Sequence, residues 1–264
     1  MERYLLKTSL DQHLGQLDDL ALSLADLMTT EGLTWPDRLR LYRWPKNTPF
    51  KDALVRVQDL LGRLREISEK VGNNSSLSWA EEQRLKQVTL DIFKWGGVTR
   101  GKSKRDPSII DIRNVITTAF EWSRVGSAPL DSGWSKLAAF STDYLEDSQK
   151  SPQVIYDSRV AFSLIRKTER LLKQEKFAGL RPVMEEHLRY IPGRGGNRAT
   201  WKPIGWQRGW GRWESQFFAS LYVRRIRDVL NRSPKKYGLM SRADGNEGCW
   251  TTRGVEMVLF MDGY

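Results

Sequence analysis

Apolar residues recur along the chain at intervals of three and four, the spacing that places them on one face of an α-helix. Leucines follow this spacing between residues 2 and 28, with a break expected near Gly15, and the pattern returns over residues 49–71. The same spacing predicts further helices over residues 134–147, 158–174, 181–190, 213–231 and 252–262. The chain is therefore expected to be mainly α-helical.

Local signals at helix ends predict two more helices. The segment "SWAE" is a capping box formed by Ser78 and Glu81, and the helix it begins should end at the "WGG" of residues 95–97. Pro107 suits the first turn of a helix that carries apolar residues as far as Phe120.

Alternation of apolar and polar residues, the pattern of a half-buried strand, occurs only around residues 153–156. We therefore expect little or no sheet. A loop over residues 98–106 suggests an N-terminal helical lobe over residues 1–106 and a helical core over residues 107–264.

Composition excludes several classes of protein. Of 264 residues, 39% are hydrophobic and 11% aromatic, so the chain can bury a core. No apolar run approaches the roughly 20 residues of a membrane span, and the first residues do not resemble a secretory signal, so a cytoplasmic location is expected. Cys249 is the only cysteine and the two histidines are far apart, so we expect neither a metal nor a cofactor. Cys249 itself is expected to be a small buried residue.

Positive charge is concentrated in one part of the chain. The net charge is +11, and the segment from Arg159 to Arg242 holds 20 lysines and arginines against 6 acidic residues. Tryptophans in "TWKPIGWQRGWGRW" lie in the same segment and suit stacking on bases, whereas an Arg-rich surface of no special function is the simpler reading. The residues expected to contact DNA are Arg159, Arg194, Arg198, Lys202, Arg208 and Arg212.

A lysine and an aspartate stand near the starts of two consecutive predicted helices. Lys136, in "SGWSKLAAFS", falls in the first turn of one helix, and Asp157, in "YDSRVAFSL", caps the next. A partly desolvated lysine is a nucleophilic amine, and a nearby carboxylate can stabilise a cation-like sugar or activate water, so the pair suits cleavage of an N-glycosidic bond. Alternatively, Asp157 is only a cap and Lys136 is solvated or contacts a phosphate.

These two segments together resemble the helix-hairpin-helix DNA glycosylase superfamily. Leu130 and Lys136 match the ends of its hairpin motif L-P-G-V-G-x-K-T-A, and Asp157 matches the aspartate of its V-D-T-H-V segment. Ser132 and Trp134 occupy the positions of the two hairpin glycines, so the phosphate-binding hairpin is altered or lost. The resemblance covers residues 108–170, under a third of the chain. It is strongest to a divergent bacterial branch with an 8-oxoguanine-DNA-glycosylase-like fold.

The resemblance implies a helical fold with a cleft between two helical lobes. Lys136 would be the amine nucleophile or a cation that lowers the barrier, and Asp157 the essential carboxylate. The target base must leave the duplex. Trp95 and Trp134 are candidate walls of the base pocket, or equally core residues, and Asp131 is a candidate polar contact.

The leading hypothesis is a DNA glycosylase that removes a modified base from double-stranded DNA. Within the resembled branch, the expected substrate is glucosylated hydroxymethylcytosine in phage DNA, which makes the protein an antiviral enzyme, and nicking through a Lys136 Schiff base could accompany base removal. The alternatives are a non-catalytic DNA-binding module of the same fold and a repair glycosylase for oxidised bases. A nuclease is disfavoured because no acidic metal-binding cluster or histidine pair stands out.

Overall fold

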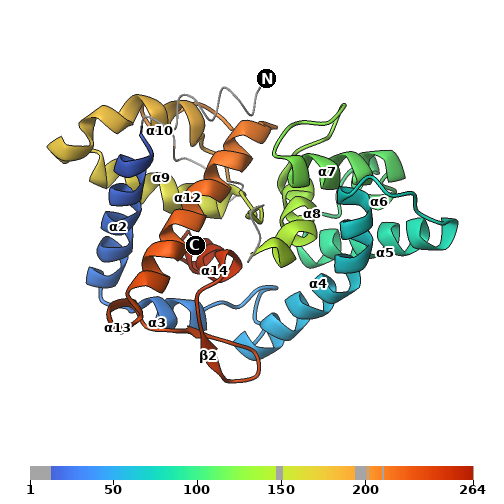
Figure 1. Ribbon diagram of the computed structural model, residues 1–264, viewed down its shortest axis with the longest axis horizontal. Coiled ribbons are helices and arrows are strands. Elements are labelled where there is room, and N and C mark those ends of the chain that lie inside the picture. The colour runs from blue at the N-terminus through green and yellow to red at the C-terminus, as the bar shows by residue number, and fades with distance from the viewer. Residues whose placement is uncertain (1–12, 147–150, 194–200, 202, 210, 264) are drawn as a thin grey trace. The chain divides into compact units, whose positions relative to one another are not determined.

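The computed structural model describes residues 13–146, 151–193, 201, 203–209 and 211–263 (Figure 1). Within these residues the protein is mainly helical, as the apolar spacing predicts. The only sheet among them pairs two short antiparallel strands, β1 (Met240–Ser241) and β2 (Glu247–Gly248). The strand considered around residues 153–156 is wrong, because those buried residues join no ladder.

The chain folds into two compact units. Arg43–Ile155 forms one, which we call the inserted unit, and the chain up to Tyr42 forms the other together with the chain from Tyr156 onward, which we call the discontinuous unit. In Figure 1 the discontinuous unit joins the blue helices near the start of the chain to the orange and red helices near its end. The boundary expected at residue 106 falls inside the inserted unit, because the loop there separates helices that pack on one another.

In the discontinuous unit, α2 packs on α12 and α9, and α14 packs on α3, α9 and α12. Leu17, Leu20 and Leu24 of the expected stripe are buried. Helix α2 begins at Leu14, next to the break expected near Gly15, while residues 2–12 of the expected helix lie outside the described residues. None of the described helices is long and apolar enough to cross a lipid bilayer. The elements are α2 (Leu14–Thr30), α3 (Trp35–Arg40), α9 (Ser158–Leu171), the 3-10 helix η2 (Glu175–Leu180), α10 (Arg181–His187), α12 (Trp213–Arg232), α13 (Pro234–Tyr237) and α14 (Thr252–Asp262).

In the inserted unit, α8 is the central helix. It packs on α4, α5 and α7, and all of its residues except Ser132 are buried. The capping box of Ser78 and Glu81 is confirmed, but Ser108 caps α7, so Pro107 precedes that helix. The elements are α4 (Phe50–Gly72), α5 (Trp79–Trp95), α6 (Lys102–Arg105), α7 (Ile109–Glu121), α8 (Ser132–Thr142) and the 3-10 helix η1 (Asp143–Leu145).

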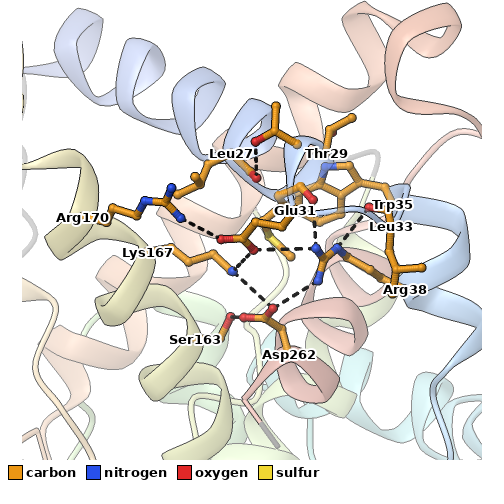
Figure 2. Close-up of polar contacts among 12 residues, drawn as sticks. Leu27, Thr29, Glu31, Leu33, Trp35, Arg38, Ser163, Lys167, Arg170 and Asp262 are labelled. Atoms are coloured by element: carbon orange, nitrogen blue, oxygen red, sulfur yellow. Dashed lines mark hydrogen bonds and ion pairs between the residues drawn. The ribbon is translucent and has the colours of Figure 1, made fainter.

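A network of charged side chains joins both parts of the discontinuous unit (Figure 2). The ammonium of Lys167 on α9 lies 2.7 Å from Glu31 Oε2 at the end of α2 and 3.2 Å from Asp262 Oδ1 at the end of α14. Arg38 on α3 lies 3.2 Å from the same Asp262 oxygen and donates a hydrogen bond to the Met28 carbonyl. Four helices distant in sequence are thereby held by shared ion pairs.

Candidate functional site

Lys136 lies in the second turn of α8, one turn later than the sequence pattern predicts. The helix begins early because Asp131 caps it, its Oδ1 accepting hydrogen bonds from the backbone N–H groups of Gly133 and Trp134. The Lys136 residue is only 3% exposed. Its ammonium donates to both the carbonyl and the hydroxyl oxygen of Ser132, each 2.9 Å away.

The aliphatic part of Lys136 lies against the C-terminal end of α5. Gly96 caps that end, and a Cβ atom added to Gly96 would overlap the Cδ and Cε atoms of the lysine. Gly96 directly follows Trp95, so two candidate residues that are distant in sequence lie close together. The structure therefore brings Lys136 and the backbone next to Trp95 together within the inserted unit.

The two candidate tryptophans have different surroundings. Trp95 is half-buried, packs edge-on to Phe140 at 5.1 Å between ring centroids, and lines a pocket of about 580 Å³. Trp134 is almost completely buried and packs edge-on to Phe93 at 5.0 Å. The structure thus favours a core role for Trp134, whereas Trp95 remains available to a ligand.

Lys104 is a buried lysine that sequence reasoning missed. Only 6% of it is exposed, and its ammonium lies 4.1 Å from the ring centroid of Trp134 and 4.9 Å from that of Phe93. Asp131 Oδ2 is 3.0 Å away. Burial lowers the pKa of Lys104, and the nearby Asp131 carboxylate opposes this shift. The lysine lies in the run "GKSKRD", whose polar pattern is typical of an exposed loop.

Asp131 stabilises the fold, whereas the sequence suggested that its carboxylate contacts the base. One carboxylate oxygen caps α8 and the other pairs with Lys104. The residue therefore ties the loop that contains α6 to the start of α8.

Asp157 caps α9, as predicted, in the discontinuous unit. Its buried carboxylate accepts hydrogen bonds from the backbone N–H groups of Arg159 and Val160 at 2.9 and 3.3 Å. The Arg159 guanidinium is 3.9 Å from Asp157 Oδ2 and 4.7 Å from the Phe260 ring centroid. Because Lys136 belongs to the inserted unit, its pairing with Asp157 stays a prediction.

The Trp-rich basic segment is only partly suited to stacking on bases. Trp206 and Trp213 are buried, and the Trp206 indole N–H donates to Glu169 at 2.9 Å, so the expectation that these rings stack on nucleic acid is wrong. Arg208 and Arg212 are exposed, and Arg208 donates a hydrogen bond to the Tyr190 hydroxyl. The candidates Arg194, Arg198 and Lys202 lie outside the described residues.

Part of the positive charge in this segment is used within the discontinuous unit. Arg225 pairs with Asp18 on α2 at 2.9 Å, and Lys236 lies 2.6 Å from Asp26 on the same helix. Like the Lys167 network, these pairs use carboxylates that precede or follow the basic segment. Fewer cations therefore face solvent than the charge count alone indicates.

The comparisons with known proteins add no assignment. No protein-family model, curated protein or solved structure matches this chain. Within the described ranges, no group of three or more histidine, cysteine, aspartate or glutamate side chains is placed to hold a metal ion. Cys249, expected to be buried, is exposed, because the neighbouring Trp250 fills the core position instead.

Proposed function

We propose that the protein is a DNA glycosylase that cleaves the N-glycosidic bond of a modified base in double-stranded DNA. The observation that carries this proposal is the position of Lys136. Its side chain lies against Gly96, the residue that follows the pocket-lining Trp95 in the chain. A desolvated amine close to an aromatic residue that lines a pocket suits attack on an extruded nucleotide. By the resemblance above, glucosylated hydroxymethylcytosine in phage DNA is the first substrate to test.

In the proposed reaction Lys136 acts as the nucleophile. Its neutral amine forms a bond to C1′ of the sugar while the bond from C1′ to the base breaks, and the departing base takes up the proton that the amine loses. Opening of the sugar ring then leaves an imine between the enzyme and the DNA. Asp157 is proposed to stabilise the positive charge that develops on the sugar.

The second candidate is a DNA-binding module without catalysis. It is favoured by the hydrogen bonds from Lys136 to both Ser132 oxygens and by the capping role of Asp157, since both are structural tasks. In this case the exposed Arg208 and Arg212 would contact phosphates, while Lys136 and Asp157 would stabilise the fold.

The two candidates are separated by base release. Full-length protein is incubated with duplexes that carry cytosine, glucosylated hydroxymethylcytosine or 8-oxoguanine, and released bases are identified by mass spectrometry. Borohydride reduction traps the imine. A glycosylase releases one modified base, and the identity of that base distinguishes phage defence from repair of oxidised bases.

Two conservative variants preserve the fold while removing the chemistry. Asp157→Asn keeps a good helix cap, and Lys136→Met keeps the aliphatic packing against Gly96. We expect both to lose base release, whereas Lys235→Met, at an exposed position, should retain it. Retained release in the first two variants, or no release by the unaltered protein while DNA binding persists, would leave the non-catalytic module.

DNA binding is tested through its salt dependence. Neutralising phosphates releases counterions, so affinity for duplex DNA should fall steeply as salt rises. An affinity that stays constant over a tenfold range of salt would refute both candidates.

A further inference from the structure

The pocket that Trp95 lines has a chemical character of its own. It lies in the inserted unit, and its walls come from α4, from the last turns of α5 and from Pro45. Its volume of about 580 Å³ is that of a small-molecule site. Val55, Leu60 and Trp95 supply the apolar surface, and four charged side chains complete the lining: Arg56, Asp59, Asp91 and Lys94.

The lining of this pocket carries two cations and two acids, and the acids have a further partner outside it. Arg63, which lies outside the lining, binds both acids, with its guanidinium 3.5 Å from Asp59 and 2.5 Å from Asp91. Arg56 and Lys94 form no ion pair with any residue that the structure describes, and both are exposed. With Arg63 counted, three cations accompany the two acids, which leaves a net charge of +1, and Arg56 and Lys94 remain available to an anionic ligand.

The aromatic wall also contains a hydrogen-bond donor without a partner, the indole N–H of Trp95, which is buried and has no acceptor among the described residues. Trp35, Trp122 and Trp250 each donate to a backbone carbonyl. Trp44 donates to the carbonyl of Trp95 itself at 3.0 Å, which holds the backbone at this point. The Trp95 ring is therefore held by its edge-on packing against Phe140 and not by a hydrogen bond from its own N–H to any described residue.

We propose that this pocket binds a nucleoside monophosphate. The base would lie against Trp95 and its aliphatic neighbours, and the phosphate would pair with Arg56 and Lys94. A phosphate monoester carries close to two negative charges near neutral pH, which matches two cations on two different helices. A planar ring matches the aromatic wall, and the sugar occupies volume that a small aromatic acid would leave empty. This inference concerns the same Trp95 pocket that the glycosylase proposal uses for the extruded nucleotide, but it is argued from the lining of the pocket alone and requires neither Lys136 nor Asp157.

Isothermal titration calorimetry of the full-length protein tests this inference with three probes. They are deoxycytidine monophosphate, deoxycytidine, which lacks the phosphate, and inorganic phosphate, which lacks the ring. We expect the nucleotide to bind at least about tenfold more tightly than either fragment, because only the nucleotide contacts both the aromatic wall and the two cations. Absence of nucleotide binding at millimolar concentration, or equally tight binding of inorganic phosphate, would overturn the proposal.

Variants locate the binding on the pocket. Arg56→Gln and Lys94→Gln should each weaken nucleotide binding by about tenfold or more, since each removes a charged contact to the phosphate. Lys51→Gln, on the exposed surface of α4 outside the pocket lining, should bind as the unaltered protein does. If all three variants bind alike, the nucleotide binds elsewhere and the proposal fails. Base release is measured separately, so the outcome for this pocket does not depend on the glycosylase proposal.

Discussion

Replacing Lys167 with methionine should destabilise the discontinuous unit by about 2–3 kcal/mol. Methionine keeps most of the apolar side chain, so the main change is the loss of the ammonium. The side chain of Lys167 is 8% exposed, and its ammonium contacts two carboxylates, Glu31 at 2.7 Å and Asp262 at 3.2 Å (Figure 2). Its removal leaves both acids with less compensation in a partly buried environment.

The magnitude lies between two limits. Removing one partner of a fully buried ion pair costs about 3–5 kcal/mol, whereas an exposed pair contributes about 0.2–1 kcal/mol. The side chains of Glu31 and Asp262 are 29% and 16% exposed, so water recovers part of the loss. Arg38 also remains, at 3.7 Å from Glu31 and 3.2 Å from Asp262. These two effects lower the expected loss below the buried limit.

The matched control is Arg170→Met. Arg170 pairs with the same Glu31 at 3.1 Å, but its side chain is 65% exposed, so the loss should stay within about 1 kcal/mol. Urea unfolding of each full-length variant, followed by far-UV circular dichroism, gives the free energies from the midpoint and slope. If the two variants lose the same stability, or Lys167→Met loses less than about 0.5 kcal/mol, burial does not strengthen this network and the reasoning is refuted.

Three further outcomes are expected from equally local features. Gly96→Ala should lower the melting temperature and base release because the new methyl group displaces Lys136. Gly62 is an exposed helical residue, and a Cβ atom added there would meet no atom within 4 Å, so Gly62→Ala should stabilise the protein by about 0.5–1 kcal/mol. Burial lowers the pKa of Lys104 below 10.5, so in the alkaline range the unfolded state binds more protons than the folded state. The free energy of unfolding should therefore rise as the pH increases toward 10.5. The Lys104→Met variant should show a smaller rise of this free energy over the same range. A lysine hydrogen bond lowers the pKa of Glu81 from 4.5 to about 2, so its contribution is present above pH 4.5 and lost as pH falls toward 2, and acid unfolding of Glu81→Gln should lack that loss.

Features that depend on neighbouring residues in sequence are predictable here. The capping box at Ser78 and Glu81 and the cap at Asp157 are confirmed, because a cap is made within one helical turn. The apolar stripes of α2 and α4 likewise identify the faces that become buried. Such signals predict the long helices, whereas the short helices α3, α6 and α13 are not among those they predict.

Features that depend on which helices meet are not predictable from this one chain. Lys104 is buried only because α5 and α8 supply Phe93 and Trp134 around its ammonium. Trp206 and Trp95 look equally suited to binding in sequence, yet the first is in the core and the second lines a pocket. The spacing of single tryptophans does not encode this difference, because it arises from contacts between distant segments.

The division of the discontinuous unit has a consequence for the order in which the protein folds during synthesis. The leucine face of α2 is covered mainly by α12, which the ribosome makes much later. At rates of synthesis of about 5–20 residues per second, that face waits on the order of ten seconds or more for its partner. The inserted unit is contiguous in the chain and can fold in that interval. The helix α2 is therefore made early but covered late, and until then it is a natural client for a chaperone that binds exposed apolar segments.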